Sequence, residues 1–327
     1  MTVSERSTRP LVPVLVGPTA AGKTAVAVAL AERLPVTIIS ADARQVYRRL
    51  DIGTAKPDHA TRARVPHAGL DVVVPGERYS AGRFARDAAG WITEALAAGR
   101  QPVVVGGTGF YVRALADGLF HEPPLDPERR GRLQAWAAGV PGPALVRWAS
   151  RLDPRFSGGG RQRAARVLEV ALLTRRPLSL WQQMARATGV MRPWYVVLTV
   201  PRELLRRRIA ERVDAMLAAG LVDEVRAELA RGTAPTAAGL DGVGYRETVA
   251  MLEARLAPAE LRDAIVRATR AYAKRQETWF RHQLRDQPST ISRQPDNAWT
   301  LDATKPPEEL ADVIAARWRA IKLTADS

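Results

Sequence analysis

Apolar residues in this 327-residue chain fall into two alternating patterns. Short apolar runs, which are typical of buried strands, occur at residues 11–16, 36–40, 70–74, 101–105, 194–200 and 299–301. Apolar residues at helical spacing predict amphipathic helices at residues 25–34, 81–98, 202–219, 258–281 and 306–321. Strands that alternate with helices in this way indicate an α/β fold with a parallel sheet.

The loop between the first strand and the first helix has the pattern G-x-x-x-x-G-K-T. Backbone N–H groups of such a loop and the N-terminus of the following helix cradle phosphate, and the lysine adds a full positive charge. The threonine hydroxyl can ligate Mg²⁺. We therefore predict a di- or triphosphate site with Mg²⁺ as its cofactor and Thr24 as the metal ligand. The loop residues are Gly17, Pro18, Thr19, Ala20, Ala21, Gly22, Lys23 and Thr24.

Two further polar residues follow predicted strands. Asp42 comes after the second strand, and Thr108 comes after the fourth, in the stretch from Gly106 to Tyr111. Ligands of an open parallel sheet bind at the carboxyl ends of its strands, so both residues are expected beside the phosphate loop. Asp42 can accept a proton. Thr108 can hydrogen-bond a bridging or leaving oxygen, where a nucleoside triphosphatase would usually carry an acid.

Two arginines are candidates to reach a pyrophosphate from the helix predicted at 202–219. Arg208 and Arg212 are one helical turn apart and therefore share a face. A solvated helix face is the alternative interpretation of this pair.

Basic residues outnumber acidic ones by 49 to 34, a formal net charge of +15, which favours a polyanionic partner such as RNA. Residues 129–176 hold eleven arginines and two acids, a net charge of +9. On the helix predicted at 258–281, a basic face lies opposite Tyr272 and Trp279 if each residue turns by about 100°. That face consists of Arg267, Arg270, Lys274 and Arg281. Ordinary solvation is the alternative for both regions.

Composition narrows the class of protein. The chain contains no cysteine and only four scattered histidines, so neither a disulfide nor a thiolate zinc site is expected. No apolar run approaches the roughly 20 residues of a membrane span, and residues 1–10 are too polar for a signal peptide. We expect a cytoplasmic protein without membrane contact.

Several motifs in order along the chain resemble the tRNA dimethylallyltransferase (tRNA isopentenyltransferase) family. They are the phosphate loop and the stretches 40–57, 106–111, 163–170, 242–247 and 269–281. The resemblance implies a P-loop NTPase-like core with a helical insertion that grips the anticodon stem-loop. We assign residues 1–115 and 193–327 to the catalytic core, and residues 116–192 to a mainly helical, basic, tRNA-binding insertion.

The resemblance also implies an activity. The family transfers a dimethylallyl group from dimethylallyl pyrophosphate to N6 of the adenosine on the 3′ side of the anticodon, in tRNAs that read codons beginning with U. Carried over to this sequence, Asp42 looks like the base near N6, and Thr108 looks like the group on the leaving oxygen. Lys23 belongs to the catalytic set, and the phosphate loop looks like the pyrophosphate site.

The tRNA contacts implied by the resemblance come from five parts of the chain. They are Asp42, Ala43, Arg44 and Gln45; Thr108; Arg130, Gln162, Arg163 and Arg166; Gly244, Tyr245 and Arg246; and Lys274, Arg275, Gln276, Trp279 and Arg281. The chain departs from the family pattern at Ala43, at Gly159-Gly160 and at Ala271, which bears on individual RNA contacts more than on the reaction.

Three other functions remain open on the residues alone. A small-molecule kinase would use the basic insertion as a lid over ATP, and an isopentenyltransferase acting on free AMP would need no basic RNA surface. An RNA-binding module would use the phosphate loop only as a nucleotide switch. We expect the protein to act as a monomer.

Overall fold

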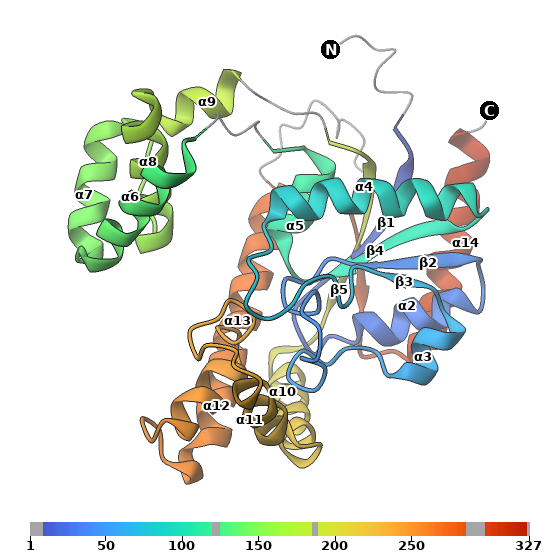
Figure 1. Cartoon of the computed structure of the whole chain (residues 1–327). Coiled ribbons are helices and arrows are strands. Elements are labelled where there is room, and N and C mark those ends of the chain that lie inside the picture. The colour runs from blue at the N-terminus through green and yellow to red at the C-terminus, as the bar shows by residue number, and fades with distance from the viewer. Residues whose placement is uncertain (1–8, 120–124, 185–188, 286–297, 326–327) are drawn as a thin grey trace. The chain divides into compact units, whose positions relative to one another are not determined.

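Six parallel strands form one sheet in the computed structural model of this chain, in the order β3-β2-β4-β1-β5-β6 (Figure 1). The structure describes residues 9–119, 125–184, 189–285 and 298–325. The strands are β1 (Leu11–Val16), β2 (Val36–Ser40), β3 (His67–Ala68), β4 (Gln101–Gly106), β5 (Arg192–Thr199) and β6 (Ala298–Asp302). The sheet confirms the predicted parallel α/β class.

Strand β1 lies in the interior of the sheet and positions the candidate site. Its last residue, Val16, pairs with Gly106 of β4 on one side and with Val197 of β5 on the other. On the far side of β4, Ser40 of β2 pairs with Val105. Because all strands are parallel, the loops that follow β1, β2 and β4 leave the same edge of the sheet.

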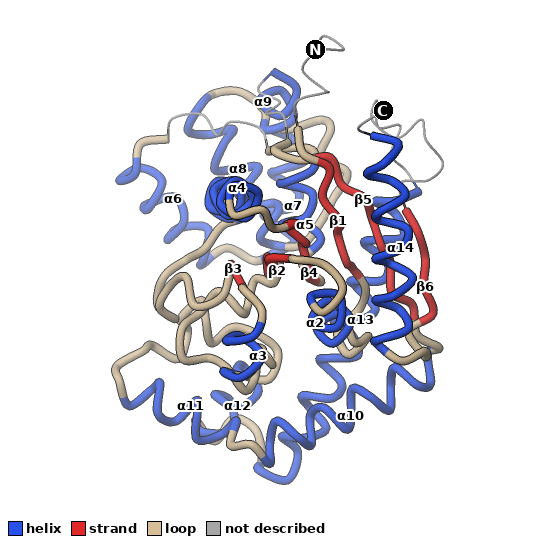
Figure 2. Tube along the Cα trace, turned by 90° about the vertical axis from the view of Figure 1, so that its right-hand side faces the viewer, coloured by secondary structure: helices blue, strands red, loops and turns tan. Residues whose placement is uncertain are grey.

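Helices cover both faces of the sheet (Figure 2). Neighbouring side chains of a strand point to opposite faces. Leu15 and Val105 belong to the core that α2 (Lys23–Ala31) and α14 (Pro307–Ala325) close from one side. The other face is covered by α4 (Ala81–Ala97), which packs against α5 (Gly109–Ala116). None of the described helices is both long and apolar enough to cross a bilayer.

A helical layer follows β5 and flanks the carboxyl edge of the sheet. It consists of α10 (Arg202–Ala218), α11 (Leu221–Ala230), α12 (Tyr245–Leu252), a 3₁₀ turn (Pro258–Glu260) and α13 (Leu261–Arg285). A short helix, α3 (His59–Arg64), precedes β3. Leu205, Ile209 and Val213 form the buried stripe of α10, which packs along α13. This contact determines which side of α13 is buried.

Residues 117–189 form a second compact unit, and the rest of the chain forms the first. The second unit contains α6 (Pro127–Gly139), α7 (Gly142–Leu152), α8 (Arg161–Thr174) and α9 (Leu178–Met184). Leu145 of α7 and Val167 and Leu168 of α8 are the centre of its own apolar core. The buried carboxylate of Asp153 accepts hydrogen bonds from Ser179 N at 2.8 Å and Ser179 Oγ at 2.7 Å. The unit therefore has the core of an independent domain.

One predicted strand, at residues 70–74, is wrong. The chain there makes a single bridge, between Val73 and Tyr47, and the strand of this region is the two-residue β3. Asp71 has φ 54°, and its carboxylate pairs with Lys56 and Arg62, both at 2.6 Å. This left-handed backbone conformation departs from the extended conformation that the apolar pattern favours.

The other predicted elements occur with small shifts at their ends. The first helix starts at Lys23 and ends at Ala31, before a turn that precedes Pro35. The helix predicted at 258–281 opens as a 3₁₀ turn and continues to Arg285. His67 of β3 contacts the Val65 carbonyl oxygen through Nδ1 at 2.7 Å.

A buried carboxylate on α11 gives a prediction about folding stability. Glu228 is fully buried and accepts hydrogen bonds from Nε and Nη2 of Arg49, each at 2.9 Å. Thr233 Oγ1 donates a third, at 2.6 Å. Together the Arg49 and Thr233 contacts hold the pKa of Glu228 below its usual value. The ionised form therefore stabilises the fold above the pKa of the unfolded chain, and this stability is lost as the pH falls below about 4.

We expect Arg49→Met to lower the free energy of unfolding at pH 7 by about 1–3 kcal/mol, because it leaves a buried carboxylate without its main partner. Urea titrations at several pH values measure this, and the deficit should narrow as the pH falls below about 4. The matched control is Arg226→Met, which breaks an exposed pair with Asp223. Equal losses in the two variants, or a deficit independent of pH, would contradict the role of Glu228.

Candidate active site

The loop between β1 and α2 depends on a glycine at each end. Gly17 has φ 152°, and a Cβ there would lie 2.7 Å from the carbonyl oxygen of Leu198. Gly22 has φ 87° and is the N-cap of α2, without a side-chain hydrogen bond to the first turn. The N–H groups at this helix end are therefore available to an anionic ligand. The loop predicted from the sequence pattern has the backbone of a phosphate cradle.

Two cations lie at this loop in a desolvated environment. The Lys23 ammonium donates to the carbonyl oxygens of Gly17 at 3.0 Å and Pro18 at 2.7 Å. Burial lowers the pKa of Lys23 to about 8, although attraction to Asp42 opposes the shift and repulsion from Arg212 adds to it. Burial also lowers the pKa of Arg212, again opposed by Asp42. A diphosphate at this place would be attracted by both cations.

Arg208 has a different environment from Arg212. Its Nη2 donates to the carbonyl oxygen of Ala303 at 3.0 Å, in the turn between β6 and α14. Of the two arginines predicted to reach pyrophosphate, the structure brings Arg212 beside Lys23 and Asp42. The contact of Arg208 with a ligand stays a prediction.

Asp42 and Thr108 lie at neighbouring strand ends that hydrogen bonds tie together. Asp42 Oδ1 accepts from Arg44 N at 2.8 Å, so one carboxylate oxygen is fixed by the backbone two residues on. Thr108 Oγ1 accepts from Ala43 N at 3.0 Å, and Thr108 N donates to the carbonyl oxygen of Ala41 at 3.2 Å. The sequence prediction that these two side chains meet at one edge of the sheet is thus consistent with the geometry.

The glycines around Thr108 allow close packing. A Cβ at Gly106 would lie 2.1 Å from the Ala41 carbonyl oxygen, and one at Gly107 would lie 2.0 Å from Nε2 of Gln276. A Cβ at Gly109 would lie 2.1 Å from the ring of Trp279. Any side chain at these three positions would push β2 or α13 away from the turn. The motif therefore brings α13 against the strand end that carries Thr108.

Gln276 links α13 to both loops of the site. Its side chain is 5% exposed, and its Oε1 accepts from Thr19 N in the phosphate loop at 2.8 Å. Its Nε2 donates to the carbonyl oxygen of Gly107 at 3.1 Å. The amide that we predicted to contact tRNA is thus engaged within the chain, where it fixes the phosphate loop against the Thr108 turn. Its RNA contact stays a prediction.

Tyr272 is a site residue that the sequence did not indicate. It lies one helical turn before Gln276 on α13, where the helical spacing predicts only packing. Burial raises the pKa of Tyr272 to about 12, and the nearby charge of Asp42 adds to the shift. Its phenol also interacts with Thr108 and Gln276. The signal that could have found it is its position one turn from Gln276, on the side of α13 opposite the basic face.

The other predicted tRNA contacts of the core lie on two loops at the same edge. Arg44 Nη1 donates to the carbonyl oxygen of Ala238 at 2.9 Å and pairs with Asp241, and Gln45 Nε2 donates to the Thr54 carbonyl oxygen at 3.2 Å. Tyr245 is buried, and its hydroxyl donates to Glu224 Oε1 at 2.6 Å. The chain reverses at Gly244, where φ is 93°, before the exposed Arg246. These contacts make the two loops rigid.

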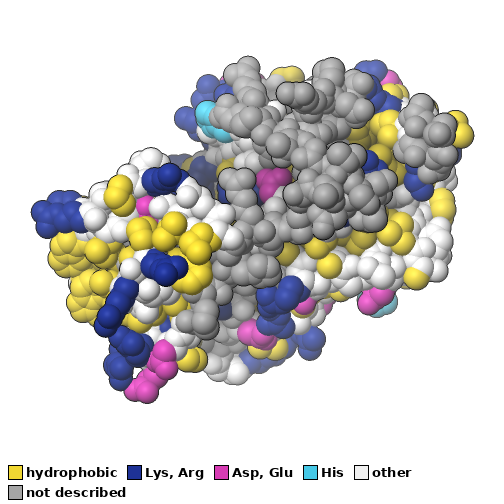
Figure 3. Space-filling view, turned by 90° about the horizontal axis from the view of Figure 1, so that it is seen from above, with side chains coloured by type: hydrophobic (Ala, Val, Ile, Leu, Met, Phe, Trp, Pro, Cys, Tyr) yellow, Lys and Arg dark blue, Asp and Glu magenta, His cyan; other side chains and the backbone are white. Residues whose placement is uncertain are grey.

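Two of the four predicted contacts in the second unit pair with one buried carboxylate. Glu169 of α8 pairs with Arg166 of the same helix and with Arg130 of α6, the latter at 3.2 Å. Gln162 and Arg163 begin α8 with exposed side chains. Figure 3 shows Lys and Arg side chains at several places on one described face of the protein. The charges of Arg130 and Arg166 are thus compensated by Glu169, whereas the exposed Arg163 is accessible to a binding partner.

The last predicted tRNA contacts are on α13. Lys274, Arg275 and Arg281 are exposed, and the Arg275 guanidinium lies 5.8 Å from the centre of the Tyr272 ring. Among the described residues no cluster of three histidine, aspartate or glutamate side chains could hold a metal ion by itself.

Comparisons with known proteins identify the family of this chain. The family model described as "IPP transferase" matches residues 45–283, and the model "Isopentenyl transferase" matches residues 10–65. The tRNA dimethylallyltransferase of Halorhodospira halophila is 46% identical over 276 residues, which are 82% of this chain and 89% of that protein. The same enzyme of Bordetella petrii is 44% identical over 278 residues, 82% of this chain and 88% of that protein.

Solved structures show the same fold. The full-length tRNA isopentenylpyrophosphate transferase of Bacillus halodurans aligns with a TM-score of 0.67 and 32% identity, over 98% of this chain and 100% of that chain. A eukaryotic dimethylallyltransferase acting on tRNA aligns with a TM-score of 0.71 at 24% identity, over 97% of this chain and 79% of that chain, which supports the fold alone. With most of its length matched by the family model and by relatives of this identity, the chain belongs to the IPP transferase family.

Proposed function

We propose that this protein transfers a dimethylallyl group from dimethylallyl pyrophosphate to N6 of the adenosine on the 3′ side of the anticodon, in tRNAs that read codons beginning with U. The names of its relatives support the activity. The observation that carries it is the convergence of a carboxylate, a hydroxyl and two desolvated cations at one edge of the sheet. These groups are Asp42, Thr108, Lys23 and Arg212.

The reaction needs proton removal and stabilisation of a leaving group. A bond forms between N6 and C1 of the allyl group, while the bond from C1 to the bridging oxygen breaks and its electron pair leaves with pyrophosphate. An exocyclic amine is a weak nucleophile, so the carboxylate of Asp42 accepts the N6 proton as the new bond forms. The adenine must leave its stack in the RNA to reach this cleft, which costs about a few kcal/mol.

The chain supplies positive charge where the pyrophosphate departs. Lys23, Arg212 and the open N–H groups at the start of α2 form this set. In the proposed arrangement, the hydroxyl of Thr108 lies next to the leaving oxygen. Because it is neutral, it hydrogen-bonds that oxygen without repelling it. The Thr108 turn contains no acidic residue that could activate water for triphosphate hydrolysis.

Mg²⁺ fits the donor set of this loop. Thr24 is exposed on the first turn of α2, and its hydroxyl is the hard oxygen ligand that Mg²⁺ prefers. When bound, Mg²⁺ would neutralise part of the charge of the diphosphate, whose oxygens supply further ligands. We infer that the enzyme acts as a monomer in the cytoplasm, with the tRNA anticodon stem-loop as its macromolecular substrate.

A direct assay tests the proposal against its rivals. The enzyme is mixed with dimethylallyl pyrophosphate, Mg²⁺ and an unmodified anticodon stem-loop, and the nucleosides are analysed by mass spectrometry. We expect one isopentenyl-modified adenosine per RNA, without added ATP. Phosphate release from ATP in step with product would favour a kinase, and efficient transfer to free AMP would favour the second rival. RNA binding without transfer would favour an RNA-binding module.

The role of Asp42 gives the next prediction. Asp42→Asn should lower the single-turnover transfer rate by about 10² or more, because the amide cannot accept the N6 proton. RNA affinity should change little. Asp58→Asn is the matched control, since this exposed residue caps α3, a role that asparagine also fills. Near-native turnover of Asp42→Asn would remove Asp42 from the mechanism.

The pKa of Lys23 gives a prediction about pH. The charged lysine binds the diphosphate, so affinity for dimethylallyl pyrophosphate should fall as the pH rises through about 8, where Lys23 loses its proton. Calorimetric titrations between pH 6.5 and 9.5, chosen to bracket that value at roughly equal distances, measure the affinity. Lys23→Met should bind more weakly and lack this decline. A decline of the same size in both proteins would assign it to the ligand.

A further inference from the structure

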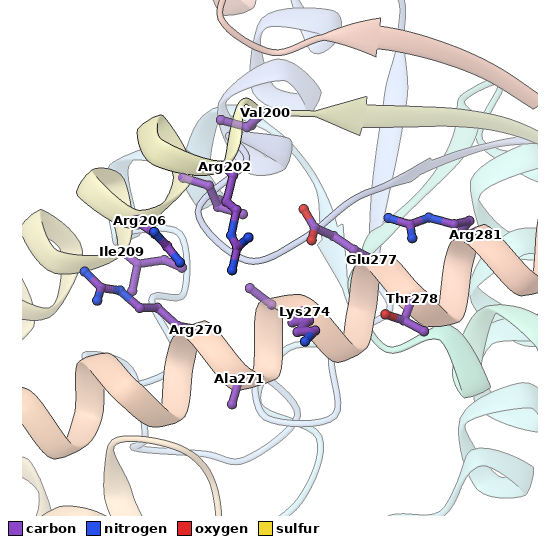
Figure 4. A pocket seen from close by; sticks show the side chains of 12 residues that line it. Val200, Arg202, Arg206, Ile209, Arg270, Ala271, Lys274, Glu277, Thr278 and Arg281 are labelled. Carbon is purple, nitrogen blue, oxygen red and sulfur yellow. The ribbon is translucent and has the colours of Figure 1, made fainter.

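A pocket opens between α10 and α13, with a volume of about 540 Å³ (Figure 4). Its apolar lining is Val200, Leu205, Ile209, Ala271 and Ala273. Its polar lining is Arg202 and Arg206 from α10, and Arg270, Lys274, Glu277, Thr278 and Arg281 from α13. Five cations thus face one carboxylate across a partly apolar hollow.

Most of these cations have no partner within the described chain. Arg206 pairs with Glu203 at 2.8 Å. Within the residues that the structure describes, Arg202, Arg270, Lys274 and Arg281 make no side-chain hydrogen bond or ion pair, and all four are exposed. Like charges repel when they gather in this way, so the cluster destabilises the protein unless an anion neutralises it.

The pocket lies on a different side of α13 from the candidate active site. With about 100° per residue, the charged pocket side chains of α13 fall within an arc of roughly 60°, whereas Tyr272 and Trp279 lie on the opposite side of the helix. The α13 residues that line the arc are Arg270, Lys274, Glu277 and Arg281. Gln276 holds the other side of α13 against the phosphate loop. The pocket is therefore separate from the cleft of Asp42 and Thr108.

The N-terminus of α10 adds a further attraction for anions. Arg202 is the first residue of this 17-residue helix, and the N-cap, Pro201, makes no side-chain hydrogen bond to the first turn. The open N–H groups of a helix N-terminus favour negative charge. The same turn lines the pocket through Arg202 and Leu205.

The length of the cation row favours a chain of phosphates. From Arg270 to Arg281, α13 rises by about 16 Å at about 1.5 Å per residue, which is longer than one diphosphate. We propose that this pocket is a second phosphate-binding site that takes the backbone of the RNA substrate, and that Arg202 and Arg206 of α10 supply half of it. This inference rests on the proposed function. It adds α10 to the RNA surface, which the sequence motifs did not include.

The test removes only the α10 half of the site. In the double variant Arg202→Gln with Arg206→Gln, the affinity for an unmodified anticodon stem-loop is measured from about 0.05 to 0.3 M salt, the range in which such contacts change affinity strongly. Each lost phosphate contact should reduce the log–log salt slope by about 0.7, so the double variant should lose about 1.4. Affinity for dimethylallyl pyrophosphate, measured by calorimetry, should stay at the wild-type value.

The matched control removes two charges elsewhere. Arg207→Gln with Arg226→Gln changes two exposed arginines that do not line the pocket and pair with Glu211 and Asp223. An equal slope in the two double variants would overturn the inference. A loss confined to diphosphate affinity would also overturn it, because the pocket would then serve the small ligand. If the wild type itself fails to bind the stem-loop, the proposed function fails first.

Discussion

One buried amide joins the two loops of the candidate active site. Gln276 accepts a hydrogen bond from Thr19 N and donates one to the carbonyl oxygen of Gly107, so α13 is tied to the phosphate loop and to the Thr108 turn at once. Without it, two backbone groups in a largely buried place would lose their partners, at a cost of about 1–3 kcal/mol each. Gly107 and Gly109 are required because α13 lies too close for any Cβ. The relative position of the phosphate loop and the Thr108 turn follows from this contact.

The second constraint on the site is electrostatic. Lys23 and Arg212 lose hydration on folding, and Asp42 is the carboxylate that opposes the resulting pKa shift of each. Two desolvated cations beside one carboxylate leave an excess of positive charge, which a diphosphate neutralises. In the proposed function, the geometry that makes the unliganded site costly is thus the geometry that would bind the donor and stabilise its departing pyrophosphate.

The sequence alone predicted those site residues that lie in a loop motif or just after a buried strand. The phosphate loop, Asp42 and Thr108 follow directly from buried strands, so their positions depend on the sheet alone. Residues 70–74 could not be predicted, because Asp71 adopts a left-handed backbone conformation while it pairs with Lys56 and Arg62, two residues that are distant in sequence and that the local apolar pattern does not reveal. The roles of Tyr272 and Gln276 depend on which side of α13 meets the sheet, and tertiary packing decides that. Helical spacing marked Tyr272 as an inward residue without revealing that the active site lies there.

The central claim is that Gln276 sets the geometry of the site, and one variant tests it most directly. Gln276→Met keeps the size of the side chain and removes both hydrogen bonds, so single-turnover transfer should slow by about tenfold or more, while affinity for the stem-loop stays near the wild-type value. Gln101→Met is the matched control, since this buried glutamine lies at the other end of β4 and its side-chain amide donates to the Pro102 carbonyl oxygen. Its transfer rate should stay close to wild type. A native rate for Gln276→Met, or a loss confined to RNA affinity, would contradict the account.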